Sequence, residues 1–163
     1  MTSIEAAYEA AEEIGIKLEI VDGLTVWEGS PVYRHQKAIR RIEDSIRRIS
    51  DSGSDCGCFH AADVGILFPD GSKKRPDISI FCVEPPEDEE IQLLPEAVIE
   101  VLSKGYEKKD TEVGAPFYLA QGVKDVILFE PRSGAVTHLR RDSRRDFTSP
   151  VLIDLECGCS CTV

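Results

Sequence analysis

The chain has 163 residues, 42% of them hydrophobic, which fits one compact domain with its own core over residues 1–163. No apolar run approaches the roughly 20 residues that span a bilayer, and no cationic stretch precedes an apolar segment at the start. We therefore expect no membrane association and a cytoplasmic location. The formal net charge of −11 gives no overall attraction for a polyanion, so contact with nucleic acid would need a locally basic surface.

The first third of the sequence predicts two helices that flank a hairpin. In chain order, the elements are a helix over residues 3–14, strands over 17–21 and 24–27, and a long helix over 32–50. Asp22-Gly23 joins the two strands, and this dipeptide adopts the positive φ angles of a tight two-residue turn. The long helix is amphipathic, with isoleucines on one face and basic residues on the other, so its apolar face should pack on a sheet.

The remainder predicts the strands of a covered sheet and one short helix. The expected elements are strands over residues 61–68, 77–83 and 97–102, a helix over 115–121, and strands over 125–130 and 134–139. The run over 97–102 is apolar on both faces except for Glu100, which is typical of a central strand covered by helices. Pro116 suits a first helical turn and Gly122 a helix end.

The basic residues are concentrated in two stretches of the chain. One lies on the long predicted helix and the other near the end of the expected sheet: Arg34, Lys37, Arg40, Arg41, Arg47 and Arg48 within 34–48, and Arg140, Arg141, Arg144 and Arg145 within 140–145. Both are either ordinary solvated faces or locally basic surfaces that contact DNA.

Five of the six cysteines lie in two tight motifs, Cys56-Gly-Cys58 and Cys157-Gly-Cys-Ser-Cys161. This spacing is closer than that of the thiolate pairs in most structural zinc sites, and disulfides are rare in cytosolic proteins. We therefore expect surface or terminal thiols without a role, with a cysteine-based metal or redox site as the alternative. Cys82 alternates with Ile78 and Ile80 and should lie in the core.

Two acids lie on strands that should be buried. Asp77 follows Pro76 at the start of one apolar run, and Glu100 lies in the middle of another. An ionised carboxylate is costly to bury without compensation, and if these strands pair, the two side chains can converge. Two carboxylates suit Mg²⁺ or Mn²⁺, which would hold a water near a phosphodiester. Alternatively, Asp77 caps a strand entrance and Glu100 pairs with a nearby Lys or Arg.

Several short motifs follow one another over about residues 15–140: Leu18-Glu-Ile-Val-Asp-Gly23, His35-Gln36, Arg75-Pro-Asp-Ile-Ser79, Val98-Ile-Glu-Val-Leu-Ser103, Asp110 with Tyr118, Gly122-Val123 and Val126-Ile-Leu-Phe-Glu-Pro131. In order and spacing they resemble the Uma2 (DUF820) family of restriction-endonuclease-like proteins. The resemblance implies an α/β (α+β) fold of the PD-(D/E)XK nuclease superfamily, with a mixed central β-sheet flanked by helices. It also implies a Mg²⁺-dependent endonuclease that hydrolyses DNA phosphodiester bonds.

The same resemblance assigns roles to particular residues. It makes Asp77 and Glu100 the ligands of Mg²⁺ (or Mn²⁺), and Glu19 and His35 further active-site candidates, although a histidine at the start of a cationic helix can also be a plain solvated residue. A homodimer is expected, since two copies suit the cutting of both strands of a duplex and symmetric dimers are the commonest assemblies.

The lysine of the family pattern is missing from its usual positions. The family carries it four residues after the acid at Asp110, where this chain has Gly114, and the superfamily carries it two residues after the Glu, where this chain has Leu102. A long flexible lysine can reach a site from a displaced backbone position. Either a nearby lysine substitutes, or the protein is a non-catalytic binding or scaffold protein on the nuclease fold; the candidates are Lys108 and Lys109, with Lys104 close by.

Overall fold

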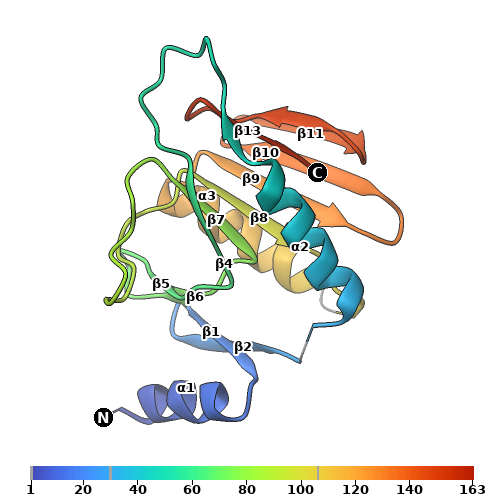
Figure 1. Ribbon diagram of the computed structural model, residues 1–163. Coiled ribbons are helices and arrows are strands. Elements are labelled where there is room, and N and C mark those ends of the chain that lie inside the picture. The colour runs from blue at the N-terminus through green and yellow to red at the C-terminus, as the bar shows by residue number, and fades with distance from the viewer. Residues whose placement is uncertain (1, 30, 106) are drawn as a thin grey trace.

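A six-stranded mixed sheet forms the centre of the computed structural model, which describes residues 2–29, 31–105 and 107–163 (Figure 1). The strand order is β11-β10-β9-β8-β7-β4. The β8–β9 pair is parallel and the other neighbours are antiparallel. The strands are β4 (Phe59–Ala62), β7 (Ile78–Phe81), β8 (Ala97–Val101), β9 (Asp125–Glu130), β10 (Ala135–Arg140) and β11 (Ser143–Thr148).

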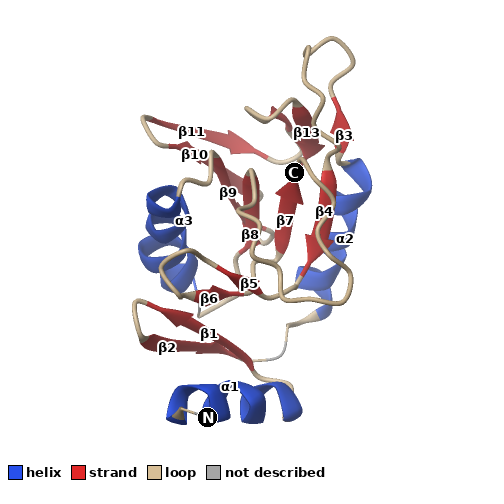
Figure 2. Cartoon of the chain, turned by 90° about the vertical axis from the view of Figure 1, so that its left-hand side faces the viewer, coloured by secondary structure: helices blue, strands red, loops and turns tan. Residues whose placement is uncertain are grey.

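One helix covers each face of this sheet, as Figure 2 shows. Helix α2 (Tyr33–Ser45) packs its buried isoleucines against Ile78, Ile80 and Ile99. Helix α3 (Ala115–Gln121) packs against the opposite face, and a π-helical turn, η1 (Lys109–Gly114), leads into it. The sheet therefore divides the interior into two cores, because alternate residues of each strand point to opposite faces.

The N-terminal segment forms a separate layer beside the central sheet (Figure 2). Helix α1 (Ser3–Glu13) precedes the hairpin of β1 (Lys17–Val21) and β2 (Leu24–Glu28), whose turn has positive φ angles at Asp22 and Gly23. The helix over 3–14 and the hairpin are thus confirmed within one residue at their ends. The hairpin joins β5 (Ile66–Leu67) and β6 (Lys73–Lys74) in a four-stranded sheet ordered β2-β1-β6-β5.

The predicted end of the long helix and the predicted strand over 61–68 were wrong, because at each point the chain enters a different sheet. The helix expected over 32–50 ends at Ser45, and Arg47–Arg48 form β3, which pairs with the C-terminal strand β13 (Cys159–Thr162). The backbone N–H of Thr162 donates to Ser45 Oγ at 2.8 Å, so distant residues fix this end. The single strand expected over 61–68 is β4 and β5, separated at Asp63, whose φ is 54°.

The C-terminal residues form further strands that the sequence did not indicate. Strand β12 (Leu152–Asp154) pairs with β13, which also pairs with β3, and this small sheet packs against the α2-side core. Strand β11 pairs with β10 in an antiparallel hairpin and forms one edge of the central sheet. Among the described residues, no helix combines the length and apolar character that a bilayer crossing requires.

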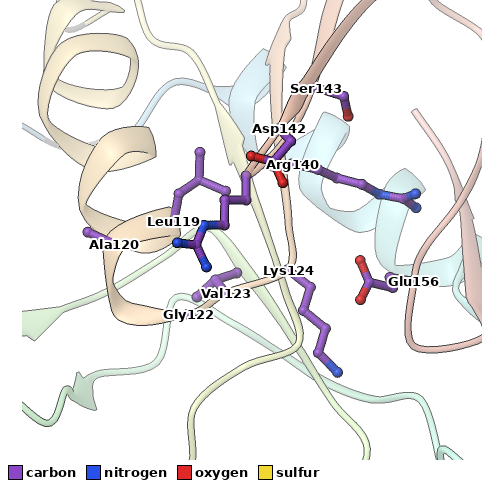
Figure 3. A pocket seen from close by; sticks show the side chains of 10 residues that line it. Leu119, Ala120, Gly122, Val123, Lys124, Arg140, Asp142, Ser143 and Glu156 are labelled. Atoms are coloured by element: carbon purple, nitrogen blue, oxygen red, sulfur yellow. The ribbon is translucent and has the colours of Figure 1, made fainter.

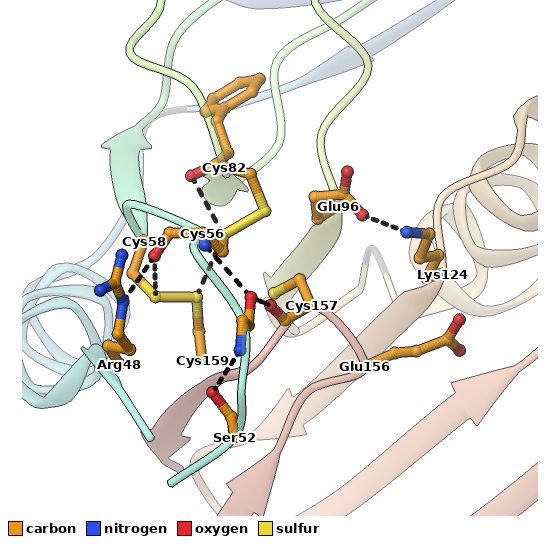
Figure 4. The surroundings of a disulfide bond; sticks show 12 residues. Arg48, Ser52, Cys56, Cys58, Cys82, Glu96, Lys124, Glu156, Cys157 and Cys159 are labelled. Carbon is orange, nitrogen blue, oxygen red and sulfur yellow. Dashed lines mark hydrogen bonds and ion pairs between the residues drawn. A yellow bond between two sulfur atoms is a disulfide. The ribbon is translucent and has the colours of Figure 1, made fainter. Parts of the chain in front are cut away.

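The prediction of surface or terminal thiols was wrong. Cys56 and Cys82 form one disulfide and Cys58 and Cys159 another, while Cys157 and Cys161 are buried thiols (Figure 4). Cys82, which was expected in the core, is half-buried and packs against the α2-side core. The error has a physical cause: β13 brings the last cysteines back against the central sheet, and this non-local pairing leaves no mark on local spacing.

Candidate active site

Strand pairing brings the two predicted metal ligands face to face. In the antiparallel β7–β8 register, Ile78 pairs with Ile99, so the next position places Asp77 opposite Glu100. The Asp77 backbone N–H donates to Glu100 Oε2 at 3.2 Å, and the Val101 backbone N–H donates to Asp77 Oδ2 at 2.7 Å. Both acids are buried, at 4% and 0% exposure.

Three more buried carboxyl groups complete what we call the acidic cluster: Glu19, Glu28, Asp77, Glu100 and Asp110. Glu19 comes from β1 and Glu28 from β2, while Asp110 lies on η1. Glu19 is oriented from the end of β6, since the backbone N–H of Arg75, the residue that follows this strand, donates to its Oε1 at 2.8 Å. The site is therefore built where the N-terminal sheet meets the α3-covered face of the central sheet.

Three lysines enter the same cluster. Lys17 Nζ lies 3.3 Å from Asp77 Oδ1, and Lys74 Nζ lies 2.7 Å from Glu19 Oε2. Lys109 Nζ contacts several carboxylates, at 2.8 Å from Glu28 Oε2, 3.1 Å from Asp110 Oδ1 and 3.7 Å from Glu19 Oε2. Five carboxyl groups against three ammonium groups leave the cluster short of positive charge.

Lys74 of strand β6 places its ammonium group beside Gly114, the position at which the family carries a lysine. A Cβ atom added to Gly114 would lie 3.7 Å from Lys74 Nζ, and the Lys74 ammonium lies 5.1 Å from the centre of the Tyr118 ring. The charge that a lysine at 114 would bring is thus supplied by β6. Leu102, at the other expected position, packs against the α3-side core.

Sequence reasoning found only one of these three lysines. Lys109 lies in the cluster, whereas Lys104 and Lys108 are exposed. Lys17 and Lys74 were missed, although alternation on β1 places Lys17 on the same face as Glu19, and that signal was available. Nothing local marks Lys74, because β6 has only two residues and its pairing with β1 is non-local.

His35 faces the acids and is not a solvated residue. It lies in the first turn of α2, is 6% exposed, and places Nε2 3.2 Å from Asp77 Oδ2. Neither ring nitrogen has a well-aligned hydrogen-bond partner among the described residues. Burial alone would lower the pKa of His35, but the contact with Asp77 raises it. A cavity of about 140 Å³, lined in part by Lys17, Glu28, His35 and Asp77, connects this end of the cluster to solvent.

The acids of the cluster differ in their protonation. Burial alone would raise the pKa of Asp77, but the charge of Lys17 and the His35 contact hold it well below its usual range. Burial, followed by the charges of Asp110 and Asp77, raises the pKa of Glu100 well above its usual value, and Tyr118 donates its hydroxyl to Glu100 Oε1 at 2.7 Å. Burial raises the pKa of Asp110 to about 6 despite the nearby Lys109.

These observations fit a hard divalent cation. Asp77 and Glu100 carry carboxyl groups at opposite positions of neighbouring strands, and carboxylate oxygen is the ligand type that Mg²⁺ and Mn²⁺ take. Asp110 Oδ1 is buried, and although Lys109 Nζ lies 3.1 Å away, it has no well-aligned hydrogen bond among the described residues, so a ligand could compete with Lys109 for this oxygen. The raised pKa values of Glu100 and Asp110 come first from burial and then from the charges of neighbouring acids, and a bound cation would offset both effects.

A larger cavity lies elsewhere and contains none of these groups (Figure 3). Its volume is about 740 Å³, and it opens between the end of α3 and the β10–β11 turn. Charged side chains of both signs line it, including Lys124, Arg140, Asp142 and Glu156. The convergence of buried acids, and not cavity size, therefore marks the candidate site.

Comparison with known proteins gives the family and the fold of this chain. Residues 5–156 match the model of the Uma2 family, described as "Putative restriction endonuclease". The chain belongs to the Uma2 family. The fold is shared with a solved protein from Anabaena variabilis ATCC 29413, described as "a putative nuclease belonging to DUF820", at a TM-score of 0.63 and 17% identity over 83% of this chain and 79% of that one. A search of curated proteins found no match.

The Uma2 assignment and the shared structure confirm the expected restriction-endonuclease-like fold. The two basic stretches differ in how free their charges are. On α2, the side chains of Arg34, Lys37 and Arg40 are exposed, and none is ion-paired within the part of the chain that the structure describes. In the second stretch, Arg140 is bound to Asp125 and Arg144 to Asp146.

Proposed function

We propose that this Uma2 protein is a divalent-metal-dependent nuclease that hydrolyses DNA phosphodiester bonds, with Asp77 and Glu100 as ligands of Mg²⁺ (or Mn²⁺). The observation that carries the proposal is the pairing of these two buried acids across β7 and β8, inside a cluster that holds more carboxyl than ammonium groups. Family membership supports the nuclease class. When bound, the cation supplies charge neutralisation at the phosphate and lowers the pKa of a nearby water.

The chain's own residues prepare this site for phosphate chemistry. Lys17 keeps Asp77 ionised, and a cation held beside Glu100 and Asp110 would favour their charged forms, which burial disfavours. Lys109, held among several carboxylates, is the best placed lysine to stabilise charge that develops on the phosphate. Lys74 orients Glu19.

The mouth of the site is suited to a phosphate backbone. His35 lines the small cavity beside Asp77, and its raised pKa favours a protonated ring that can donate to a phosphate oxygen. The exposed basic side of α2 continues from the same helical turn, so DNA lying along α2 would reach the cluster.

The test combines metal binding with cleavage. Asp77→Asn and Glu100→Gln should each abolish Mn²⁺ binding in calorimetry and cleavage of plasmid DNA, because each removes a ligand charge without changing side-chain size. Glu112→Gln, an exposed change on η1, is the matched control and should keep both activities. Retention of Mn²⁺ binding by both site variants would disprove the assignment.

A non-catalytic DNA-binding or scaffold protein is the second candidate. One observation favours it: every lysine of the cluster already has a carboxylate partner, so the site is partly neutralised without a metal. It predicts that the wild-type protein binds duplex DNA equally well with Mn²⁺ or EDTA and cleaves neither DNA nor RNA. EDTA-sensitive cleavage that is lost in Glu100→Gln excludes it.

A further inference from the structure

Five of the six cysteines gather at one end of the central sheet, away from the acidic cluster (Figure 4). Three distant segments contribute them: Cys56 and Cys58 precede β4, Cys82 follows β7, and Cys157 and Cys159 lie at the start of β13. All except the half-buried Cys82 are at least nine-tenths buried. The nuclease site uses none of them.

Three of these sulfur atoms are close enough to be ligands of one ion. The Sγ atoms of Cys56, Cys58 and Cys159 all lie within 4.8 Å of one another. Between the two disulfides, Cys56 Sγ and Cys159 Sγ are only 3.6 Å apart. Four thiolates around Zn²⁺, each at about 2.3 Å in a tetrahedron, lie about 3.8 Å apart. The contact between the disulfides therefore already has the length of an edge of a zinc–thiolate tetrahedron.

The two Cys-Gly-Cys turns are shaped for this convergence. Gly158 has a φ of +92°, and a Cβ there would collide with the side chain of Ser54. A Cβ on Gly57 would collide with the Phe59 ring. Both turns thus require glycine between their cysteines, and each delivers sulfur atoms into the same buried volume.

The fifth cysteine argues against disulfides as the only state of this cluster. Two disulfides leave Cys157 as a buried thiol whose Sγ lies within 4.8 Å of those of both Cys56 and Cys82. A thiol beside a disulfide can attack it and exchange partners, so this arrangement is not uniquely paired. A metal ion avoids the exchange because it holds its ligands as thiolates.

We propose that the reduced chain binds one structural Zn²⁺ through Cys56, Cys58, Cys82 and Cys159. Binding releases the four thiol protons and changes no oxidation state. Cys82 is taken as the fourth ligand because reduction of its disulfide with Cys56 frees a thiolate beside Cys56. Its sulfur belongs to the second group of adjacent sulfur atoms, with Cys56 and Cys157, so the Cys82 side chain must turn toward Cys58 and Cys159 to complete the tetrahedron. The ion would tie the loop before β4 to the C-terminal strand, across 101 residues of chain between Cys58 and Cys159. Arg48, whose Nε donates to the Cys56 carbonyl at 3.0 Å, lies near enough to offset part of the thiolate charge.

The decisive measurement uses the full chain, purified under reducing conditions with no added metal. Elemental analysis should find one zinc per chain. Replacement of zinc by Co²⁺ should give the intense visible bands of a tetrahedral thiolate site. Absence of zinc from the reduced chain, or a Co²⁺ spectrum without those bands, would overturn the proposal.

Variants locate the ligands. Cys58→Ser and Cys159→Ser should each lose most of the zinc, whereas Cys161→Ser should keep it, because the Cys161 sulfur belongs to neither group of adjacent ligand atoms. Asp77→Asn should also retain the zinc, which separates this ion from the one at the acidic cluster. If the cysteine variants do not fold, the zinc content and Co²⁺ spectrum of the wild-type chain still decide. Equal loss of zinc in Cys161→Ser would contradict the assigned ligands.

Discussion

Asp110 shows how the burial of an acid makes stability depend on pH. Its pKa in the folded protein is about 6, above its usual value of 3.8, because burial penalises the charged form more than Lys109 favours it. Below pH 4 the Asp110 carboxyl group keeps its proton in both the folded and the unfolded chain, so this residue imposes no ionisation penalty on folding. As pH rises through 6, the folded state must ionise a buried group, and stability is lost.

Asp110→Asn should therefore stabilise the metal-free protein at pH 7.5 and flatten its pH dependence. The pKa shift of Asp110 corresponds to a loss of at most about 3 kcal/mol in the free energy of unfolding between pH 4 and pH 7.5. The gain in Asp110→Asn is smaller than this if the amide packs less well than the carboxyl group. Urea unfolding in EDTA at a series of pH values measures this effect. Glu112→Gln, exposed on the same segment, should retain the wild-type slope. A slope unchanged in Asp110→Asn would contradict the role given to this acid.

At the scale of elements, η1 decides which lysine reaches the site. Lys109 and Asp110 both point into the acidic cluster, while Lys108, one residue earlier, is exposed. The π-helical geometry of this turn continues directly into α3, where Tyr118 contacts Glu100. Single π-helical turns are frequent at functional sites, and this one places two charged side chains inward within one turn.

The adjacent lysines make a matched pair of variants. Lys109→Met should reduce DNA cleavage on the order of 10²–10³-fold, the cost of removing one stabilising donor from a transition state. Lys108→Met should retain wild-type cleavage because its side chain is exposed and contacts no acid of the cluster. Single-turnover cleavage of a labelled duplex compares the two, with circular dichroism to verify the fold. Equal loss in both variants would remove Lys109 from its assigned role.

At the level of the whole molecule, the proposed DNA contact works against a net charge of −11. Long-range repulsion lowers the affinity for a polyanion, and only a local basic face can offset it. Helix α2 provides such a face beside the site, whereas β11 is separated from β8 by β10 and β9 and its Arg144 is paired with Asp146. We therefore propose that α2 makes the main DNA contact.

The double variant Lys37→Glu/Arg40→Glu should weaken duplex binding at least tenfold at low salt. It should also reduce the slope of log affinity against log salt by about 2, because two phosphate contacts are lost. Arg144→Glu/Arg145→Glu makes the same change in net charge and should have a clearly smaller effect. Fluorescence anisotropy of a labelled duplex measures both, with EDTA present to prevent cleavage. Equal effects of the two double variants would show that net charge alone governs binding.

The sequence by itself determined the elements whose patterns are local. Apolar periodicity located α1, the β1–β2 hairpin, α3 and the strands β7 to β10. Glu100 could be recognised because it is the one acid inside an apolar run. Its position opposite Asp77 follows from the pairing of β7 with β8. These features are encoded within a few residues of one another, so no knowledge of distant contacts was needed.

Only the tertiary structure decided what depends on distant segments meeting. The end of α2 at Ser45 depends on β13, and Lys74 reaches the acidic cluster from a two-residue strand paired with β1. The cysteine cluster draws on three parts of the chain. In each case, the stabilising free energy comes from contacts between residues that are far apart in the sequence. A local sequence pattern does not contain information about such contacts. The family lysine is the clearest example, because the sequence showed only its absence at Gly114, while the fold shows Lys74 beside that position.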